Sequence, residues 1–489
     1  MKKKLTANVI LNMIKSIMGI IFPILTYPYV SRVLQAENIG KVNYAASIVS
    51  YFLLFAMLGI TVYATREGAQ IRDNKIEFTK FVSEVYSINL FTGAISMLLL
   101  FTTICIFHQF DNYKNIIVLL SLEIPLSVLG ADWINSIFED YTYITVRTIG
   151  FQLLALIFMF LLVREQQDYM QYAFCTLISG YGAGIVNIFY TKKFCKRNIT
   201  YKLNLQKHFK PIILLFATNL ASLIYSNSDI TMLGIITTDY NVGIYSTASK
   251  VYNIFKQLLF SIVVVCLPRF SNMLASNDKK QYVNYAKKIY QLVFMLAVPL
   301  VGGIFCLSDA IIDVIAGEGY YDSVITLRIL CFAIFFAILG YFNMQLVLLP
   351  AKRDKIILHS TLIAAIVNVI ANLFLIPTLL ENGAAFTTVC AELIVFILTR
   401  HKIKDIILLK IEKKIFLQTI VSATIMYVII EIMTIIIVNS ILRLAVCFVV
   451  GIITYFFSMI LLKNELAIDS LKRLIRLKRN FSDILTRHR

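Results

Sequence analysis

A stripe of polar residues follows one face of an apolar stretch near the N-terminus. Asn8, Asn12, Lys15 and Gly19 have the spacing i, i+4, i+7 and i+11, which places them on one side of a helix. An ionisable residue at the centre of a bilayer costs at least about 2.5–3.5 kcal/mol on insertion scales. A water-filled cavity beside this face would lower that cost, and its lysine would attract an anionic ligand.

A second stripe repeats this spacing at Thr218, Ser222, Tyr225 and Asp229. In the next apolar stretch, one helix face carries Ser249, Asn253 and Lys256, with Lys250 beside it. Lysines suit phosphate as point charges. We therefore expect Lys15, Lys250 and Lys256 to surround a cavity that accepts an anionic headgroup, although Lys15 could instead snorkel to the membrane surface.

Four carboxylates also fall within apolar stretches: Glu123, Asp132, Glu392 and Glu431. Carboxylates inside a membrane can bind a coupling proton or a sodium ion, and they can equally pair with buried cations. For Glu431, near the C-terminal end, we favour the structural role.

These residues lie in a chain that is 59% hydrophobic and only 15% charged over 489 residues. Soluble domains are about 45–50% apolar and about 25% charged. A membrane-spanning helix needs about 20 apolar residues. The sequence therefore predicts an all-α polytopic membrane protein with about 14 transmembrane helices, at residues 8–31, 42–64, 82–107, 115–137, 145–163, 170–191, 211–236, 242–267, 284–308, 323–349, 356–376, 384–399, 415–437 and 443–462.

The basic residues predict the orientation. With the N-terminus inside, 37 of the 46 Lys and Arg residues fall in the cytoplasmic segments and tails. Five face the other side, and four, Lys15, Lys250, Lys256 and Arg328, lie within spans. This bias places both termini in the cytoplasm, and it explains the net charge of +18 without a nucleic-acid partner. The basic tail Leu471–Arg479 should lie on the anionic inner surface.

An internal repeat predicts two lobes. Asn38-Ile39-Gly40 matches Asn241-Val242-Gly243 at an offset of 203 residues, and both follow odd-numbered spans. The halves then share one orientation, a parallel repeat with a transport site between them. We expect an N-lobe at 1–191, a basic cytoplasmic linker at 192–210, a C-lobe at 211–402, two further helices within 403–462 and a basic cytoplasmic tail at 463–489.

Sequence motifs for catalysis and cofactor binding are lacking. The chain has no Gly-x-x-x-x-Gly-Lys-Ser/Thr motif for ATP and no Gly-x-Ser-x-Gly motif. Its five His and eight Cys are scattered, without metal-ligand spacing. The outer loops are short, and the longest, near Asp309–Tyr320, has about a dozen residues, too few to fold as a catalytic domain. We expect no enzyme activity, no metal and no cofactor.

Several motifs resemble the polysaccharide-transport family of bacterial oligosaccharide flippases, within the superfamily that includes lipid II flippases and multidrug and toxin extrusion antiporters. The resemblance extends over about residues 8–400. It rests on Tyr27–Leu34 with Gly40, Gly59-Ile60, Ala64–Glu67, Asp132-Trp133 with Phe138-Glu139, Asp229–Gly234, Val242–Tyr245, Pro268-Arg269, Asn368, Asn372, Ile376-Pro377, Asn382–Ala385, Thr387-Thr388 and Glu392.

The resemblance implies a two-lobed helical fold in the bacterial inner membrane. It implies a substrate of polyprenyl diphosphate that carries an oligosaccharide repeat unit for O-antigen, capsule or exopolysaccharide, moved to the outer leaflet by alternating access. Coupling to H⁺ or Na⁺, and partners such as a polysaccharide polymerase and chain-length machinery, would fit. The candidate cavity residues are then Asn12, Lys15, Lys250, Asn253, Lys256 and Arg328, and the candidates for gating or cation coupling are Arg66, Asp132, Asp229 and Glu392.

Two alternatives stay open. A multidrug or cation antiporter of the same superfamily would share the fold, although a cationic cavity disfavours its cationic substrates. A polysaccharide polymerase or ligase would be an enzyme with many spans, but such enzymes usually display a large outer loop, which this chain lacks.

Overall fold

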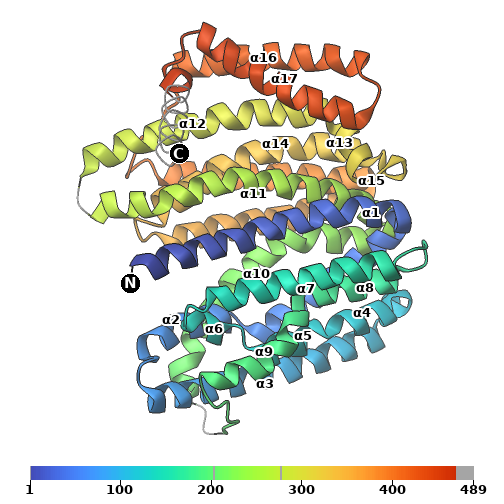
Figure 1. The fold of residues 1–489 in the computed structure, drawn as a ribbon, viewed down its shortest axis with the longest axis vertical. Coiled ribbons are helices and arrows are strands. Elements are labelled where there is room, and N and C mark those ends of the chain that lie inside the picture. Colours follow the sequence, from blue (N-terminus) through green and yellow to red (C-terminus); the bar gives the residue numbers. More distant parts are fainter. Residues whose placement is uncertain (1, 202–203, 276–277, 470–489) are drawn as a thin grey trace, which may run out of the picture. The chain divides into compact units, whose positions relative to one another are not determined.

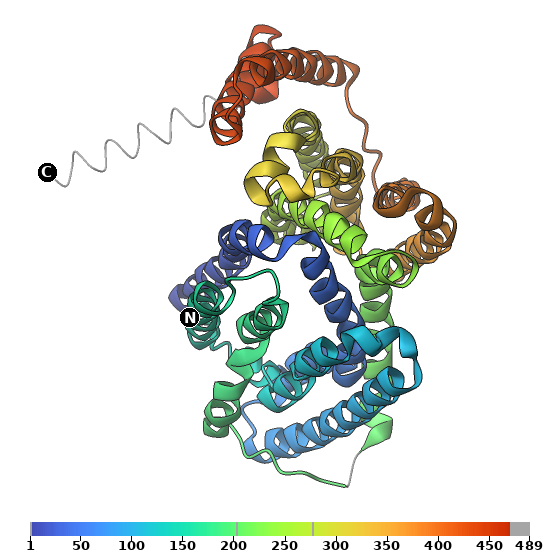
Figure 2. The same cartoon turned by 90° about the vertical axis from the view of Figure 1, so that its right-hand side faces the viewer.

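The computed structural model describes residues 2–201, 204–275 and 278–469, apart from some side chains near the N-terminus and beside the gaps. Within these ranges the chain forms helices and connecting turns, with no strand (Figures 1 and 2). The helices are α1 Lys2–Met57, α2 Ile60–Ile71, α3 Lys75–Ile106, α4 Lys114–Ser121, α5 Glu123–Gly130, α6 Trp133–Ile137, α7 Tyr141–Leu162, α8 Tyr169–Leu177, α9 Ala183–Tyr190, α10 Leu205–Ile236, α11 Asp239–Ala275, α12 Lys279–Cys306, α13 Ser308–Ile315, α14 Ser323–Phe342, α15 Asp354–Lys402, α16 Lys413–Ile436 and α17 Ser440–Leu461. Short 3₁₀ or π turns lie at His108–Tyr113, Ile178–Gly182, Thr191–Lys193, Glu318–Tyr320 and Asn343–Leu348.

Twelve helices in the described ranges are long and apolar enough to cross a membrane. Two of them are far longer than one crossing requires. The candidate span Ile17–Ile71, which contains most of α1 and all of α2, has 55 residues. As one straight helix it would extend about 80 Å at 1.5 Å per residue, against a hydrocarbon core of about 30 Å. It is interrupted at Gln35 (φ 62°, ψ 172°). Helix α15, with 49 residues, is interrupted at Leu380 (φ 52°, ψ −132°). The all-α polytopic fold is therefore confirmed. Because each of these two segments is long enough for two crossings, the expected number of fourteen transmembrane helices stays a prediction.

The fourth expected span, residues 115–137, is not one continuous helix. It consists of α4, α5 and α6. Pro125 lacks an N–H and cannot donate to the carbonyl of residue 121, which separates α4 from α5. Ala131 then adopts a left-handed conformation (φ 47°, ψ 50°) that ends α5. Asp132 therefore lies at a helix break and not inside a regular helix.

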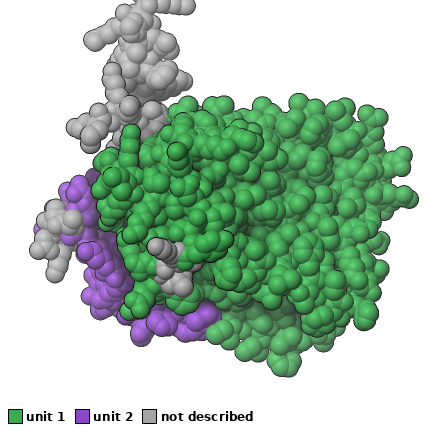
Figure 3. Space-filling model, turned by 90° about the horizontal axis from the view of Figure 1, so that it is seen from below, with its two compact units in different colours: residues 1–246, 315–320, 365–384 green, residues 247–314, 321–364, 385–489 purple. Residues whose placement is uncertain are grey.

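The chain divides into two compact units, coloured in Figure 3. Unit 1 contains residues 1–246, 315–320 and 365–384, and unit 2 contains residues 247–314, 321–364 and 385–489. In unit 1, α1 packs against α3, α4, α5, α7, α8 and α10. A buried cluster in this unit surrounds Trp133, which is fully buried beside Phe78 and Phe81. The expected boundaries at 191, 210 and 402 stay a prediction.

In unit 2, α12 packs against α14, α16 and α17, and α16 packs against α17. Buried polar bonds join the last two helices to their surroundings. Arg443 donates to Asp309 at 2.7 Å, and the Asn464 amide donates to the Gln418 side chain at 2.6 Å. The basic tail Leu471–Arg479 lies outside the described residues.

A reciprocal glycine contact within unit 1 follows the predicted repeat. Gly40 lies directly against the backbone carbonyl of Asp239, and Gly243 lies against the backbone carbonyl of Ala36. The offset of 203 residues relates Gly40 to Gly243 and Ala36 to Asp239. Such an exchange of equivalent residues is what a twofold relation between two copies produces. Glycine is required at both positions because a Cβ would overlap the opposing backbone.

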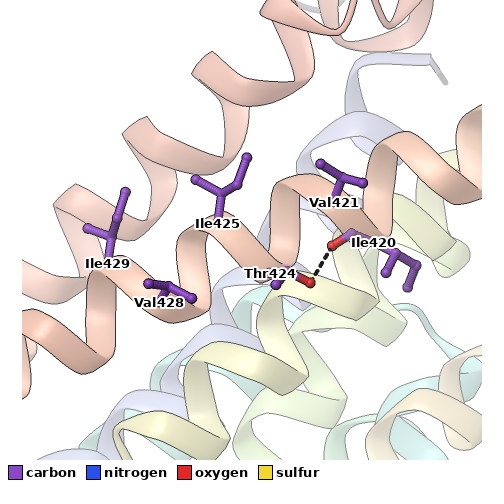
Figure 4. A pocket seen from close by; sticks show the side chains of 6 residues that line it. All are labelled: Ile420, Val421, Thr424, Ile425, Val428 and Ile429. Atoms are coloured by element: carbon purple, nitrogen blue, oxygen red, sulfur yellow. Dashed lines mark hydrogen bonds between the residues drawn. The ribbon is translucent and has the colours of Figure 1, made fainter.

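A shallow pocket lies along one side of α16, and all the side chains that line it belong to this helix (Figure 4). Its lining comes from one helix and is apolar apart from Thr424, whose hydroxyl donates to the Ile420 carbonyl at 3.0 Å. Because that hydroxyl is already bonded, the pocket offers no polar group to a headgroup. The polar candidates lie elsewhere.

Candidate functional site

Lys256 is held by a carboxylate and a tyrosine within unit 2. Its Nζ lies 3.6 Å from Glu392 Oε1 and donates to the Tyr252 hydroxyl at 3.1 Å. The Tyr252 hydroxyl in turn donates to the same Glu392 oxygen at 2.9 Å. The Lys256 side chain is 19% exposed and that of Glu392 is 8% exposed. The lysine is thus an accessible cation whose counter-ion lies on another helix, α15.

Aromatic rings support this lysine. Its Nζ lies 4.5 Å from the centre of the Tyr252 ring and 6.0 Å from that of Phe260. Phe260 stacks on Tyr341 with ring centres 3.8 Å apart. Rings at these distances attract a cation through their negative faces. They also limit the positions that the ammonium group can take.

Each of the other cavity candidates has its own surroundings within its unit. Lys250 is half-buried on α11, and a separation of six residues turns it about 120° away from Lys256 around the helix. Asn253 donates to Ser249 at 3.3 Å on the same helix. Lys15 is half-buried in unit 1, and the Asn12 side chain lies outside the described residues. The three-lysine cavity stays a prediction.

Arg328 lies in unit 2 at the side of a pocket of about 570 Å³. Its guanidinium is 5.5 Å from the centre of the Phe305 ring, and its Nε donates to the Phe305 carbonyl at 3.4 Å. Arg66, on α2, is exposed and pairs with Glu67 at 3.0 Å. Arg328 thus lies beside an apolar pocket, whereas Arg66 lies on an exposed surface beside a carboxylate.

Asp229 lies in a buried cluster within unit 1. Its Oδ1 accepts hydrogen bonds from the amides of Asn372 at 2.6 Å and Asn368 at 3.1 Å, both on α15. Its Oδ2 accepts from the Tyr245 hydroxyl on α11 at 2.6 Å. Asp229 is 4% exposed. These three donors are neutral, and they converge on one carboxylate from two other helices.

Asp132 pairs with Arg147 next to the break between α5 and α6. Arg147 donates to both carboxylate oxygens, at 3.0 and 2.8 Å, a bidentate geometry that strengthens such pairs. The Asn187 amide donates to Asp132 at 2.8 Å and to the Gly130 carbonyl at the end of α5. The Arg147 side chain is 4% exposed, whereas that of Asp132 is 61% exposed. Arg147 thus connects α7 to the break, and Asn187 connects α9 to it.

This asymmetry predicts unequal effects of substitution. Asp132→Ala would leave a buried guanidinium without its carboxylate, a change that costs about 3–5 kcal/mol in fully buried pairs; because Asp132 is exposed, we expect the lower end of that range. Arg147→Met would leave only an exposed carboxylate. Thermal unfolding of the purified protein in detergent should therefore show a larger loss for Asp132→Ala. The double variant should recover most of it, and equal losses in all three variants would contradict this assignment.

The sequence interpretation missed several of these partners. Arg147 lies at the start of the expected span 145–163, and its pairing with Asp132 was not predicted. Tyr252 and Lys256 are four residues apart, and so are Asn368 and Asn372, a spacing that puts each pair on one helix face. A second unexpected network buries His208, whose ring nitrogens lie 2.7 Å from the Tyr63 hydroxyl and 2.7 Å from Glu84. Among the described residues, no group of three His, Cys, Asp or Glu is placed to hold a metal.

The fold and these buried charges define a multi-pass helical membrane protein with ionisable groups inside its spans, a class in which such residues mark transport pathways. The chain belongs to the polysaccharide biosynthesis protein family, which matches residues 5–274. Residues 148–457 also match the family described as lipid II flippase MurJ.

Individual proteins agree with this assignment. A putative O-antigen transporter of Escherichia coli (strain K12) is 23% identical over 403 residues, which cover 81% of this chain and 95% of that protein. The capsular polysaccharide biosynthesis protein CapF of Staphylococcus aureus is 22% identical over 378 residues, 74% of this chain and 89% of that protein. The structure of lipid II flippase MurJ in an inward closed conformation has a TM-score of 0.72 at 18% identity, over 93% of this chain and 98% of that one. This last likeness concerns the fold.

Proposed function

We propose that this protein moves polyprenyl-diphosphate-linked oligosaccharide repeat units from the inner to the outer leaflet, for O-antigen, capsule or exopolysaccharide synthesis. The family and the nearly full-length match to an O-antigen transporter support this function. The observation that carries the proposal is Lys256, an accessible cation in a span with aromatic support. A lysine in a cavity binds a diphosphate as a point charge.

The contacts of Lys256 suggest how a headgroup is bound and released. Glu392 and an incoming phosphate would compete for the same ammonium group, because both are anions that need Nζ. When the phosphate binds, Tyr252 would still donate to Glu392, so that the displaced carboxylate keeps one hydrogen bond. When the phosphate leaves, the Lys256–Glu392 pair would form again. This exchange prevents the headgroup from being held too tightly for release.

We also propose that Asp229 binds the coupling cation, H⁺ or Na⁺. Carboxylates inside membrane spans of transporters bind coupling cations, and Asp229 is such a carboxylate, 4% exposed. Asn368 and Asn372 turn their N–H groups toward this carboxylate, and the Asn368 oxygen accepts from Ser228 at 2.8 Å. These amides would have to turn before their oxygens could help to hold a sodium ion. Asp132, with Arg147, and Arg66 would bias the open states.

The basic residues support an orientation in the cytoplasmic membrane with both termini inside. The transport cycle would be alternating access without covalent chemistry, and no resident cofactor is required. A polysaccharide polymerase and chain-length machinery would act on the product. The segment at 309–320, which forms α13 and a short turn, is too small for a catalytic domain, which favours a transporter over a polymerase.

Antiport of cationic drugs is the second candidate, because the superfamily that the sequence resembles includes multidrug and toxin extrusion antiporters. The candidate cavity cations Lys15, Lys250, Lys256 and Arg328 disfavour it, since they would repel such substrates. A panel of cationic drugs on the deletion strain tests this candidate, and unchanged susceptibility would exclude it.

The deciding experiment follows two pools in a deletion strain, the lipid-linked oligosaccharide and the surface polysaccharide. We expect surface polymer to disappear while the lipid-linked repeat unit accumulates facing the cytoplasm. Repeat units that reach the outer leaflet unpolymerised would instead identify a polymerase. Two unchanged pools would contradict the flippase function.

A further inference from the structure

The pocket beside Arg328 contains none of the residues that contact Lys256. Arg328 is a candidate cavity residue, but the exchange proposed at Lys256 does not use it. Helix α14 provides most of its lining, with Phe305 of α12 and Phe386 and Val389 of α15. Seven of its eight lining residues are apolar, and Arg328 is the exception. Its volume of about 570 Å³ falls within the range of about 300–1,000 Å³ that is usual for small-molecule sites.

Arg328 has hydrogen-bonding capacity to spare. In the part of the chain that the structure describes, its one hydrogen bond runs from Nε to the Phe305 carbonyl, and no ion pair joins it to an acidic residue within 4.0 Å. The two Nη groups are therefore available to a ligand. Such a pair of N–H donors matches the two free oxygens of a phosphodiester in a bidentate way. The Phe305 ring, 5.5 Å away, holds the guanidinium plane.

The apolar lining continues from Arg328 in one direction along α14. Phe332 and Phe336 follow at i+4 and i+8 on the same helix face, and they extend the lining by about 12 Å at 1.5 Å per residue. Phe332 is 50% exposed and Phe386 is 51% exposed. With the predicted orientation, α14 begins on the outer side, so Arg328 lies nearer the headgroups and Phe336 deeper in the membrane.

We propose that this pocket binds an anionic glycerophospholipid of the outer leaflet, with its phosphodiester on Arg328 and one acyl chain along Phe332 and Phe336. A single arginine balances the one negative charge of a phosphodiester, whereas a diphosphate carries more. Apart from Arg328, the lining is apolar and offers no side-chain hydrogen bonds to the hydroxyl groups of an oligosaccharide. Basic pockets between transmembrane helices bind anionic lipid headgroups on the cytoplasmic side of membranes, and the same charge pairing would act here on the outer side.

The test uses the full-length protein reconstituted in phosphatidylcholine vesicles with a small fraction of phosphatidylglycerol that carries a photoreactive acyl chain. After illumination, mass spectrometry maps the labelled peptides. We expect labelling of the α14 peptide with Phe332 and Phe336, and a loss of at least fivefold in Arg328→Gln. Arg269→Gln is the matched control, because that arginine also packs on a ring, Tyr285 at 4.3 Å, but lies outside the pocket.

A second variant keeps the test decisive if Arg328→Gln does not fold. Ile325→Glu puts a carboxylate three residues before Arg328 on an exposed position, where it would pair with the arginine and repel the phosphate. We expect the same loss of label. Full labelling in either folded variant would overturn the proposal. So would removal of the label by stoichiometric undecaprenyl diphosphate, which would assign the pocket to the transported lipid. Because the assay measures binding, it is independent of the export experiment.

Discussion

Lys256→Ala should stop the export of surface polysaccharide while the protein stays in the membrane at its normal level. The substitution removes the ammonium group that would hold the diphosphate. It also leaves Glu392, which is 8% exposed, without its cation. Unlike a guanidinium, this carboxylate can take up a proton and it keeps its hydrogen bond from Tyr252, so the local fold should survive. We expect at least a tenfold loss of surface polymer and a matching rise of the lipid-linked repeat unit, both measured in a deletion strain that expresses the variant.

Three further variants test whether the loss of export comes from the missing positive charge at position 256. Lys256→Arg keeps the charge and should retain part of the export. Glu392→Gln removes the competing anion, so it should raise the affinity of the purified protein for the lipid-linked headgroup. Lys288→Ala removes another lysine of unit 2, one in an exposed pair with Asp469 at 3.5 Å, and should have little effect. Export at the normal rate in Lys256→Ala would refute the phosphate-binding role.

Asp229→Asn should abolish the dependence of the protein on its coupling cation and reduce export by at least tenfold. The new amide keeps the shape of the side chain but has no negative charge to hold a cation. A cation that binds only the folded protein raises its stability by about 2.7 kcal/mol at a concentration 100 times its Kd. Thermal unfolding of the purified wild type should therefore shift with sodium if Na⁺ is the ion, and this shift should be lost in Asp229→Asn.

Glu381→Gln is the matched control for Asp229. Glu381 is also a buried carboxylate of unit 1, 7% exposed, and it accepts a hydrogen bond from the Asn241 amide at 2.7 Å. Its variant should keep the response to the cation. A wild-type response and normal export in Asp229→Asn would exclude Asp229 as the cation site.

Much of the fold follows from local sequence. Backbone groups in a bilayer must bond within their own segment, so each apolar run of about 20 residues predicts a helix. The matching tripeptides at Gly40 and Gly243 predicted a repeat, and the two glycines make the reciprocal contacts with Asp239 and Ala36 that a twofold relation produces. Local sequence was a poorer guide at the fourth span, because the left-handed Ala131 that ends α5 has no strong sequence signature.

The sequence by itself determined that this is a helical membrane protein, which residues place charge inside its spans, and which family it resembles. Only the tertiary structure decided which charges meet. Tyr252 bonds Glu392 across 140 residues, and Asn372 bonds Asp229 across 143, so neither pairing can be read from spacing along one helix. The physical reason is that a charge in the membrane is stable only beside its partner, and packing of distant helices selects that partner.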